Sequence, residues 1–370
     1  MFIELHILQN FAPSNLNRDD TNNPKDCEFG GVRRARISSQ CIKRSIRRHP
    51  DFTDATQVEP AKRTRWVTRL LTQRLVEAGK AENDAKAVAD AMAQQYSKLD
   101  KKGNTVVLLY LSDGELRSLT EKVLQSWETV QAEATQDKKP TLEELMKAVV
   151  KETKDRTSAP DIALFGRMLA EKPDLNLDAA CQVAHAISTH RVVMDIDFYT
   201  AVDDLQSDEE TGAGMMGVTG FNSACFYRYA AIDWGQLVKN LAGDVELARR
   251  TVEGFLRAAV LAVPTGKQNS FAAQNPPSLV LAVTNKGRQP WSLANAFEVP
   301  VRSGRDGGLV AESVAALDRY WGHLTRMYGS KGLMPVALAE DGNLLQNLAG
   351  AQVDSLDRWV ADILAQLPQG

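Results

Sequence analysis

A dense run of positive charge between Gly30 and Arg48 constrains this chain more than any other feature. The run reads GGVRRARISSQCIKRSIRR, and from Arg33 onward it holds seven Lys or Arg and no Asp or Glu, although the whole chain has a formal net charge of -3. An ordinary solvated helix would mix acidic residues with the basic ones. The excess therefore favours a surface that meets a polyanion, and a merely solvated basic helix is the alternative.

The same run contains a short strand signal followed by the start of a helix. Two glycines precede the alternating residues 34–37, and Ser38 and Ser39 are candidate N-caps. On that helix Ile42 and Ile46 mark the buried side. The polar positions that share one face by i, i+3 and i+4 spacing are Gln40, Lys43, Arg44 and Arg47. Basic side chains beside a helix N-terminus predict a track that holds phosphates.

Length and composition predict a soluble globular protein of about two domains. The chain has 370 residues, of which 44% are hydrophobic and 25% charged, and a domain holds ~150 residues as a prior. No apolar run approaches the ~20 residues needed to cross a bilayer, and the N-terminal residues MFIELHILQN contain no basic segment of a signal peptide. We therefore expect a cytoplasmic protein.

The spacing of cysteines and histidines gives no support for a metal site. The four cysteines lack CxxC spacing, and the five histidines form neither an HxxxH pair nor an HExxH motif. Residues 212–217, GAGMMG, have GxGxxG spacing, but Val218, Thr219 and Gly220 follow without the Lys of a Walker pattern, so nucleotide triphosphates are not expected there. We predict reduced cysteines, no metal and no cofactor.

Hydrophobic periodicity predicts an α+β chain with a helical insertion and one protruding loop. Residues 1–8 alternate as a half-buried strand, and the polar loop at residues 11–31 contains prolines, Asn, Asp and paired glycines that argue against regular structure. Residues 61–99 and 112–154 have helical periodicity, and Thr141 with Glu144 predicts a capping box.

The second half of the chain is predicted to return to strands and helices. Residues 162–168 read as strand and turn, and residues 177–188 as a helix. Two strands, at residues 190–199 and 221–233, flank an acidic and glycine-rich excursion, so they predict an extended hairpin whose tip leaves the body. Later elements are expected at residues 244–263 (helix), 278–285 (strand), 292–298 (short helix), 314–327 (helix), 332–338 (strand) and 353–367 (helix).

Several collinear segments resemble the CasC-type backbone subunit of the type I-E CRISPR Cascade complex, within the repeat-associated RAMP superfamily. The matching segments are NLNRDD (15–20), FGGVRRARISSQ with CIKR (29–44), DIALFGRM (161–168), AHAISTH (184–190), DIDFYTAVDDLQ (195–206), FYRYA (226–230) and SLANAFE (292–298). The resemblance spans most of the chain, with only a loose match at residues 50–154.

The resemblance implies an RRM-like (ferredoxin-like) palm at residues 1–49 and 155–370, helical fingers inserted at residues 50–154, and a β-hairpin thumb at about residues 193–223. It also implies a non-catalytic scaffold for antiviral defence, of which copies stack as a helical filament along a CRISPR RNA together with other Cascade subunits. Such a filament grips the RNA backbone and leaves bases free to pair with target DNA.

The resemblance assigns RNA-binding roles to residues of suitable chemistry. Cations suit phosphates, and Ser and Gln hydrogen-bond oxygens without reading bases. The matching positions for phosphates and sugars are Arg18, Lys25, Ser38, Gln40, Lys43, Arg44 and Arg47. Met168 matches an apolar side chain that packs on bases, and Tyr199 and Thr200 match residues that wedge between nucleotides. A small basic loop near the RNA groove contains Gly266, Lys267 and Gln268. For Met168 and Tyr199 a place in the core is the alternative.

Two other functions stay open on the sequence. Relatives in other CRISPR systems cut bound target RNA with an acidic loop residue, and Asp19 or Asp20 lies in a comparable loop. Such a carboxylate can instead orient Arg18 through a salt bridge. No paired base or metal-ligand spacing accompanies either aspartate. The third function, a metabolic enzyme with a small-molecule pocket, has no motif behind it.

Overall fold

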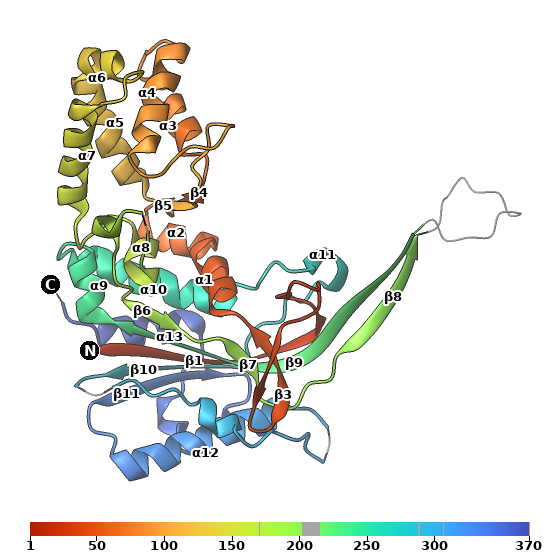
Figure 1. Cartoon of the computed structure of the whole chain (residues 1–370). Coiled ribbons are helices and arrows are strands. Elements are labelled where there is room, and N and C mark those ends of the chain that lie inside the picture. The colour runs from red at the N-terminus through yellow and green to blue at the C-terminus, as the bar shows by residue number, and fades with distance from the viewer. Residues whose placement is uncertain (170, 202–214, 288, 306, 370) are drawn as a thin grey trace, which may run out of the picture. The chain divides into compact units, whose positions relative to one another are not determined.

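The computed structural model describes residues 1–169, 171–201, 215–287, 289–305 and 307–369 (Figure 1). The chain divides into two compact units. Unit 1 contains Met1–Phe52, Gln182–Ile232 and Glu253–Pro368, and unit 2 contains Thr53–Cys181 and Asp233–Val252 together with Gln369. A large antiparallel sheet and many helices confirm the predicted α+β class. Among the described residues, none of the helices is long and apolar enough to span a membrane.

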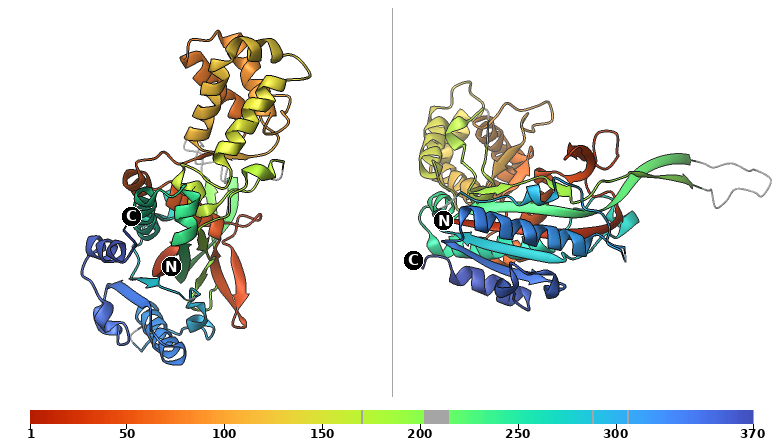
Figure 2. Two further views of the ribbon diagram at one scale, coloured as in Figure 1. Left: turned by 90° about the vertical axis from the view of Figure 1, so that its left-hand side faces the viewer. Right: turned by 90° about the horizontal axis from the view of Figure 1, so that it is seen from below.

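A sheet forms the body of unit 1, as the views in Figures 1 and 2 show. Its strand order is β11-β10-β1-β9-β7-β3-β2, and β6 and β8 pair with β9 outside this path. The strands are β1 (Phe2–Ser14), β2 (Asp26–Phe29), β3 (Val32–Ile37), β6 (Cys181–Val183), β7 (Ala186–Ser188), β8 (Asp195–Ala201), β9 (Met215–Asp233), β10 (Leu279–Asn285) and β11 (Leu333–Ala339). Buried Leu281 of β10 belongs to one core with Leu317 and Trp321 of helix α12, so this helix covers one face of the sheet.

Within the described residues, six helices lie wholly or partly in unit 1. They are α1 (Ser39–Arg47), α2 (Pro50–Thr56), α10 (Val245–Leu261), α11 (Gln268–Phe271), α12 (Val310–Tyr328) and α13 (Leu356–Ala365), with short 3₁₀ turns at Ala294–Phe297, Gly342–Leu344 and Ala349–Ala351. Helices α2 and α10 continue into unit 2. Helix α13 is tied to the sheet because the indole Nε1 of Trp359 donates to the carbonyl of Val336 on β11 (2.9 Å).

Strand β1 is buried on both faces, whereas its alternating pattern predicts one exposed face. Glu4, His6 and Gln9 are each almost fully buried. The Glu4 carboxylate accepts from the Asn285 side chain (2.8 Å), and burial raises its pKa to about 7. His6 Nδ1 lies 2.9 Å from the Tyr227 hydroxyl, and burial lowers the pKa of His6 to about 3. The alternating pattern does not predict burial here, because β1 is a central strand and its buried polar side chains form hydrogen bonds with other buried residues.

Unit 2 is mainly helical and has its own core. Leu71, Leu75, Val88, Met92 and Leu119 are fully buried there. Its helices are α3 (Val67–Glu77), α4 (Glu82–Gln94), α5 (Asp113–Gln125), α6 (Trp127–Glu133), α7 (Pro140–Thr153), α8 (Pro160–Phe165) and α9 (Trp234–Asn240), with a 3₁₀ turn at Pro173–Leu175. Strands β4 (Lys62–Thr64) and β5 (Leu109–Leu111) form a separate antiparallel pair.

Several sequence predictions of local structure are wrong. The loop at 11–31 contains the end of β1 and all of β2. Residues 160–165 form helix α8 because Pro160 suits a first helical turn and Gly166 ends the helix with a φ of 72°. Residues 177–188 form β6 and β7 and no helix, because they find a strand partner in β9.

The predicted capping box at Thr141 is also wrong. The Thr141 hydroxyl donates to Glu133 Oε1 (2.8 Å), and the capping box of unit 2 lies at the start of α5, where Ser112 and Glu115 cap each other's backbone N–H groups. The predicted hairpin strands, by contrast, are confirmed. Strands β8 and β9 pair antiparallel from Asp195 opposite Phe221 to Ala201 opposite Met215. The tip of the excursion lies outside the described residues.

Candidate nucleic-acid interface

Helix α1, in unit 1, begins directly after Ser38, one of the two N-caps that the sequence predicts. Ser38 is the N-cap, with extended backbone and a side-chain Oγ that accepts from the Cys41 N–H (3.3 Å). Ile42 and Ile46 are buried, so the opposite side of the helix faces outward. Gln40 and Arg44 are exposed, and Lys43 and Arg47 are half-buried. The first turn of α1 carries no acidic residue, which leaves the helix N-terminus electropositive.

A depression of about 440 Å³ lies beside this helix, at Cys41, Arg44 and Ser45. Three segments that are far apart in sequence line it, namely the loop after β1, helix α1 and the loop after α10. The lining residues include Asn17, Arg18, Asp19, Asp20, Asn22, Cys41, Arg44, Ser45, Thr265 and Gly266. Burial raises the pKa of the Cys41 thiol, so this group stays protonated. The two guanidinium groups can donate to an anion. The Ser45 hydroxyl donates to the Cys41 carbonyl (3.1 Å), and Asp19 and Asp20 add negative charge to the same lining.

The loop after β1 is fixed by its own polar side chains. Asn17 Oδ1 accepts from the Ser38 backbone N–H (2.8 Å), so this loop is tied to the start of α1. The buried Asn15 amide donates to the carbonyls of Asn22 (3.1 Å) and Gly220 (2.9 Å). Sequence reasoning missed both asparagines, although they stand in the NLNRDD segment. They do not present charge, but they hold the loop that presents Arg18.

Arg18 and Asp19 have different partners from those considered on the sequence. Arg18 Nη1 donates to Asn22 Oδ1 (2.8 Å). Asp19 Oδ1 accepts from the Thr21 hydroxyl (2.8 Å) and from the backbone N–H groups of Thr21 and Asn23 (both 2.9 Å). These bonds lower the pKa of Asp19, and the bond from the Thr21 hydroxyl has the largest effect. The carboxylate of Asp19 therefore organises its own turn, and Asn22 takes the orienting role toward Arg18.

The loop at residues 264–268 lies against the same segment. Gly266 packs so closely on the backbone of Leu16 that a Cβ would collide with the Leu16 carbonyl. Lys267 has a positive φ of 51° and precedes the short helix α11. The Gln268 amide donates within its own loop, to the carbonyls of Pro264 (2.9 Å) and Ala273 (3.2 Å). Gly266 thus lines the depression, and Gln268 shapes the loop behind it.

Not all of the basic run faces outward. Arg34 on β3 is fully buried and donates to the carbonyls of Phe29 (3.0 Å), Ser188 (3.2 Å), Phe297 (2.8 Å) and Glu298 (3.2 Å). Gly30 packs on the Glu298 carbonyl with a φ of 60°, so no side chain fits there. The interpretation of the whole run as a phosphate track is wrong at Arg34, which is part of the interior.

The other β3 arginines also have partners in the sheet. Arg33 forms a salt bridge with Asp26 on β2 (2.8 Å). Arg36 Nε donates to the Asp26 carbonyl (3.0 Å). Beyond β3, the exposed cations of the run are Arg44 on α1 and Arg48 directly after it. Lys25 of the predicted set is half-buried, and its backbone N–H donates to the Asn17 carbonyl (2.9 Å).

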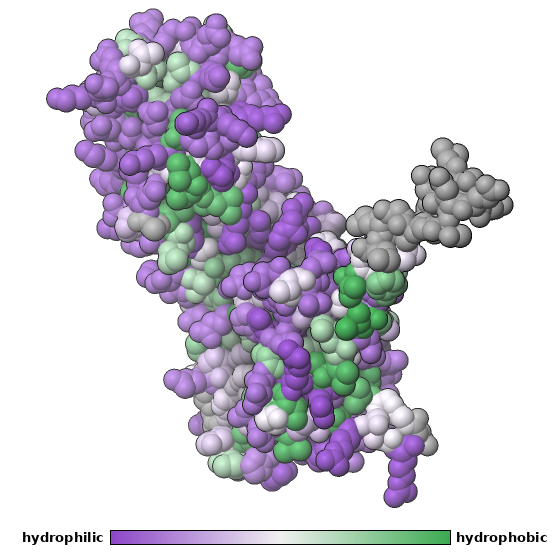
Figure 3. Space-filling view, turned by 45° about the vertical axis from the view of Figure 1, so that its right-hand side comes forward, coloured by the Kyte–Doolittle hydropathy of each residue, from purple (hydrophilic) through white to green (hydrophobic). Residues whose placement is uncertain are grey.

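The hairpin of β8 and β9 exposes an apolar surface. Ile196, Phe198 and Val218 are each at least 60% exposed, and Phe198 and Val218 are directly paired across the two strands. Figure 3 shows hydrophobic side chains gathered beside the atoms drawn in grey. Tyr199 is exposed, and its ring lies over Gly217 on the neighbouring strand. Thr200 is exposed beside it. The alternative of a core tyrosine is therefore wrong for this chain.

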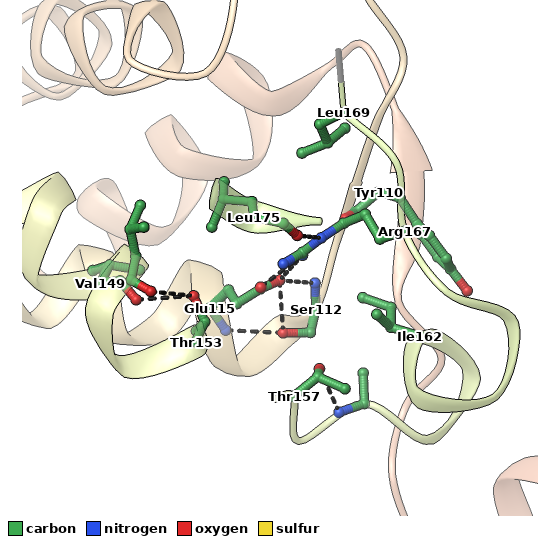
Figure 4. Close-up of polar contacts among 12 residues, drawn as sticks. Tyr110, Ser112, Glu115, Val149, Thr153, Thr157, Ile162, Arg167, Leu169 and Leu175 are labelled. Atoms are coloured by element: carbon green, nitrogen blue, oxygen red, sulfur yellow. Dashed lines mark hydrogen bonds and ion pairs between the residues drawn. The ribbon is translucent and has the colours of Figure 1, made fainter. Parts of the chain in front are cut away.

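Met168 lies in unit 2, in a turn that follows α8, and is 86% exposed. The alternative of a core methionine is wrong. The neighbouring Arg167 points inward, where its Nη1 forms a buried salt bridge with Glu115 (2.6 Å to Oε1) and its Nε donates to the Leu175 carbonyl (2.7 Å) (Figure 4). A buried ion pair of this kind fixes the turn from which Met168 projects.

The candidate RNA-binding residues therefore fall into three groups. Arg18, Arg44 and Gly266 line one depression in unit 1, with the other α1 residues on the same helix. Tyr199 and Thr200 belong to the hairpin, and Met168 belongs to unit 2. The assignment of these residues to RNA stays a prediction.

Comparisons with known proteins match the chain to one protein family and to chains of solved structures. A family model described as CT1975-like protein matches residues 3–362. A chain of the solved structure titled "CRISPR RNA-guided surveillance complex, pre-nicking" is 30% identical, with a TM-score of 0.86, and the match covers 99% of each chain. A chain of a structure titled "CRISPR RNA-guided surveillance complex" is 26% identical, with a TM-score of 0.77 over 99% of this chain and 100% of that one. Curated proteins gave no significant match.

Proposed function

Because this chain belongs to the CT1975-like protein family, we propose that it is a non-catalytic subunit of a CRISPR RNA-guided surveillance complex. In this proposal it is a CasC-type backbone subunit of a type I-E Cascade. Copies assemble as a filament on the guide RNA with the other subunits, in the cytoplasm. Residues 1–49 and 155–370 act as the RRM-like palm, the helices within residues 50–154 act as fingers, and the β8–β9 hairpin acts as the thumb.

The observation that carries the proposal is the depression beside α1. Arg18 from the loop after β1 and Arg44 from α1 line it together with Thr265 from the loop after α10. These groups suit phosphate and sugar oxygens, which carry no sequence information. A scaffold for many different guides needs a grip of this kind. The similarity to chains from RNA-guided complexes supports RNA as the polyanion.

Separate surfaces suit contacts with bases. Met168 is exposed on a rigid turn, and a thioether packs on any base face. The exposed ring of Tyr199 and the apolar hairpin surface suit insertion between nucleotides. Bases left free by the grip on the backbone then pair with target DNA. This division of roles between backbone and bases is part of the proposal.

The copurified nucleic acid tests the proposed function. The chain is co-expressed with its companion subunits and a CRISPR array, and RNA is extracted from the purified complex. We expect RNA of one defined length that matches the array. A complete complex that carries no RNA, or that is stabilised thermally by metabolites and not by RNA, contradicts the proposal.

The ribonuclease alternative gains no support from the surroundings of Asp19. Its Oδ1 is occupied by three hydrogen bonds, and its lowered pKa makes it a weak base. The purified complex is incubated with complementary RNA and magnesium or manganese. We expect the RNA to stay intact in both the native complex and an Asp19→Ala variant. Regularly spaced cuts that Asp19→Ala abolishes would establish the ribonuclease.

A further inference from the structure

Unit 2 contains a second depression that the grip on the backbone does not use. It has a volume of about 570 Å³ and lies under the turn that carries Met168. Its lining includes Arg63, Leu108, Tyr110, Phe165, Met168, Asn176 and Leu177. Both Leu108 (58%) and Met168 (86%) expose most of their side chains at this site. Large apolar side chains that stand exposed around a hollow indicate a binding site.

One cation of the lining, Arg63, is stacked on an aromatic ring. The Arg63 guanidinium lies 4.4 Å from the centroid of the Tyr110 ring. Tyr110 is buried, whereas Arg63 is exposed and lines the depression, so one face of the guanidinium is covered and the other is presented to a ligand. A flat cation held this way is a stacking platform for a second flat group.

The walls of the depression are fixed by buried polar contacts. The Tyr110 hydroxyl donates to Asp161 (2.6 Å), and both Asp161 oxygens accept from the Ala61 N–H (3.1 Å). Arg167 donates to the Tyr110 carbonyl (3.2 Å) and to Glu115, as Figure 4 shows. Unit 2 thus retains a buried ion pair, which is costly to desolvate, directly beneath its most exposed apolar residue. These contacts hold the walls in place without a ligand.

We propose that this depression binds one unstacked nucleobase, between the Arg63–Tyr110 stack and the side chains of Leu108 and Met168. The inference rests on the proposed function, because it takes the nucleic acid from there. A nucleobase is flat and largely apolar on its faces, which fits a guanidinium platform and aliphatic walls. The Asn176 side chain is also in the lining; its Oδ1 accepts from the Leu169 N–H (2.6 Å), which leaves the amide NH₂ as the donor for a base edge. The base comes from the guide RNA or from its target strand.

Photo-crosslinking tests this proposal in the assembled complex. Leu108 is replaced by p-benzoylphenylalanine, and Val76 on α3, which is 42% exposed in the same unit, receives the same replacement as a matched control. Crosslinks are mapped by primer extension on the guide RNA and by mobility shift of a labelled target strand. We expect crosslinks from position 108 at nucleotides with a fixed spacing, and none above background from position 76. The labelled strand tells which source supplies the base.

A second variant separates stacking from simple charge. Arg63→Lys keeps the positive charge but removes the planar group. In the position-108 crosslinking background, we expect Arg63→Lys to reduce the crosslinking yield while the guide still copurifies. Guide RNA in the complex without crosslinks from position 108, or crosslinks to protein alone, overturns the nucleobase site and leaves the proposed function intact. A complex without any RNA overturns both.

Discussion

The two halves of the basic run, β3 and α1, carry arginines with opposite surroundings. Arg34 is fully buried and is surrounded by four carbonyl groups, whereas Arg44, ten residues later, is exposed at the rim of a depression. Both residues have the same side chain and stand in the same dense stretch of charge. A dense run of charge therefore indicates a functional region. Only the packing shows which cations are part of the interior and which are available to a ligand.

The largest effect is expected from the buried half. In an Arg34→Met variant the carbonyls of Phe29, Ser188, Phe297 and Glu298 lose their donor, and a buried unsatisfied acceptor costs about 1–3 kcal/mol. We expect a loss of about 3–5 kcal/mol in the free energy of unfolding, because water replaces part of the missing bonds. Urea denaturation measures it, with exposed Arg33→Met as the control, for which a loss below about 1 kcal/mol is expected. Equal losses of unfolding free energy in both variants would contradict the difference between the buried Arg34 and the exposed Arg33.

The paired glycines before β3 sharpen the same contrast. Both have a positive φ, but a Cβ at Gly30 collides with the Glu298 carbonyl, whereas a Cβ at Gly31 meets nothing within 4 Å. We expect Gly30→Ala to lower the free energy of unfolding by about 2–4 kcal/mol, from backbone strain plus overpacking, and Gly31→Ala by about 1 kcal/mol from strain alone. Thermal unfolding of both variants compares them. A Gly31 variant as unstable as the Gly30 variant would refute the close packing.

The interior polar residues of β1 give a dependence on pH. His6 has a folded pKa of about 3, below its usual value, so its contribution to stability is lost as the pH falls below 6.5. Glu4 has a folded pKa of about 7, above its usual value, so its contribution is complete below pH 4.5 and is lost as the pH rises to 7. Between pH 4.5 and 6.5 the two slopes, each about 1.4 kcal/mol per unit, oppose each other.

Removal of His6 should uncover the slope of Glu4. In a His6→Gln variant we expect the free energy of unfolding, relative to the native protein, to gain about 1.4 kcal/mol for each pH unit between 6.5 and 4.5. Urea titrations at several pH values measure this difference. If the difference between native protein and variant does not change with pH, the imidazole does not titrate in the way that its burial implies.

The exposed half should affect binding and leave folding unchanged. Arg44→Ala is expected to change the free energy of unfolding by no more than about 0.5 kcal/mol. It should lower the affinity for RNA of any sequence and reduce the slope of log affinity against log salt by about 0.7, the value for one phosphate contact on a single strand. Fluorescence anisotropy at several salt concentrations gives the slope. An unchanged slope means that Arg44 does not contact phosphate.

The sequence predicts elements where local signals and packing agree. Ser38 as the N-cap, Ile42 and Ile46 on the buried side, and the β8–β9 hairpin are all confirmed. Residues 177–188 mislead because their small apolar residues suit a helix equally well, and only pairing with β9 makes them strands. The interior place of Arg34 leaves no local signal either, because its four acceptors come from segments up to 264 residues away.

The candidate site shows the same limit. The sequence predicts Arg18, Arg44 and Gly266 one by one, and the structure brings them to one depression. The asparagines that hold the loop, Asn15 and Asn17, were missed because a structural amide has the same appearance in sequence as any loop asparagine. The stacked pair of Arg63 and Tyr110 was also missed, since the two residues meet only through the pairing of β4 with β5.

The most direct test of the central claim is the affinity of the chain for two single-stranded RNAs of equal length and unrelated sequence, measured over a range of salt. The account predicts equal affinities for the two strands and a steep fall of both with salt, because α1 and its depression contact phosphates and do not read bases. A strong preference for one sequence, or an affinity that does not depend on salt, would contradict it.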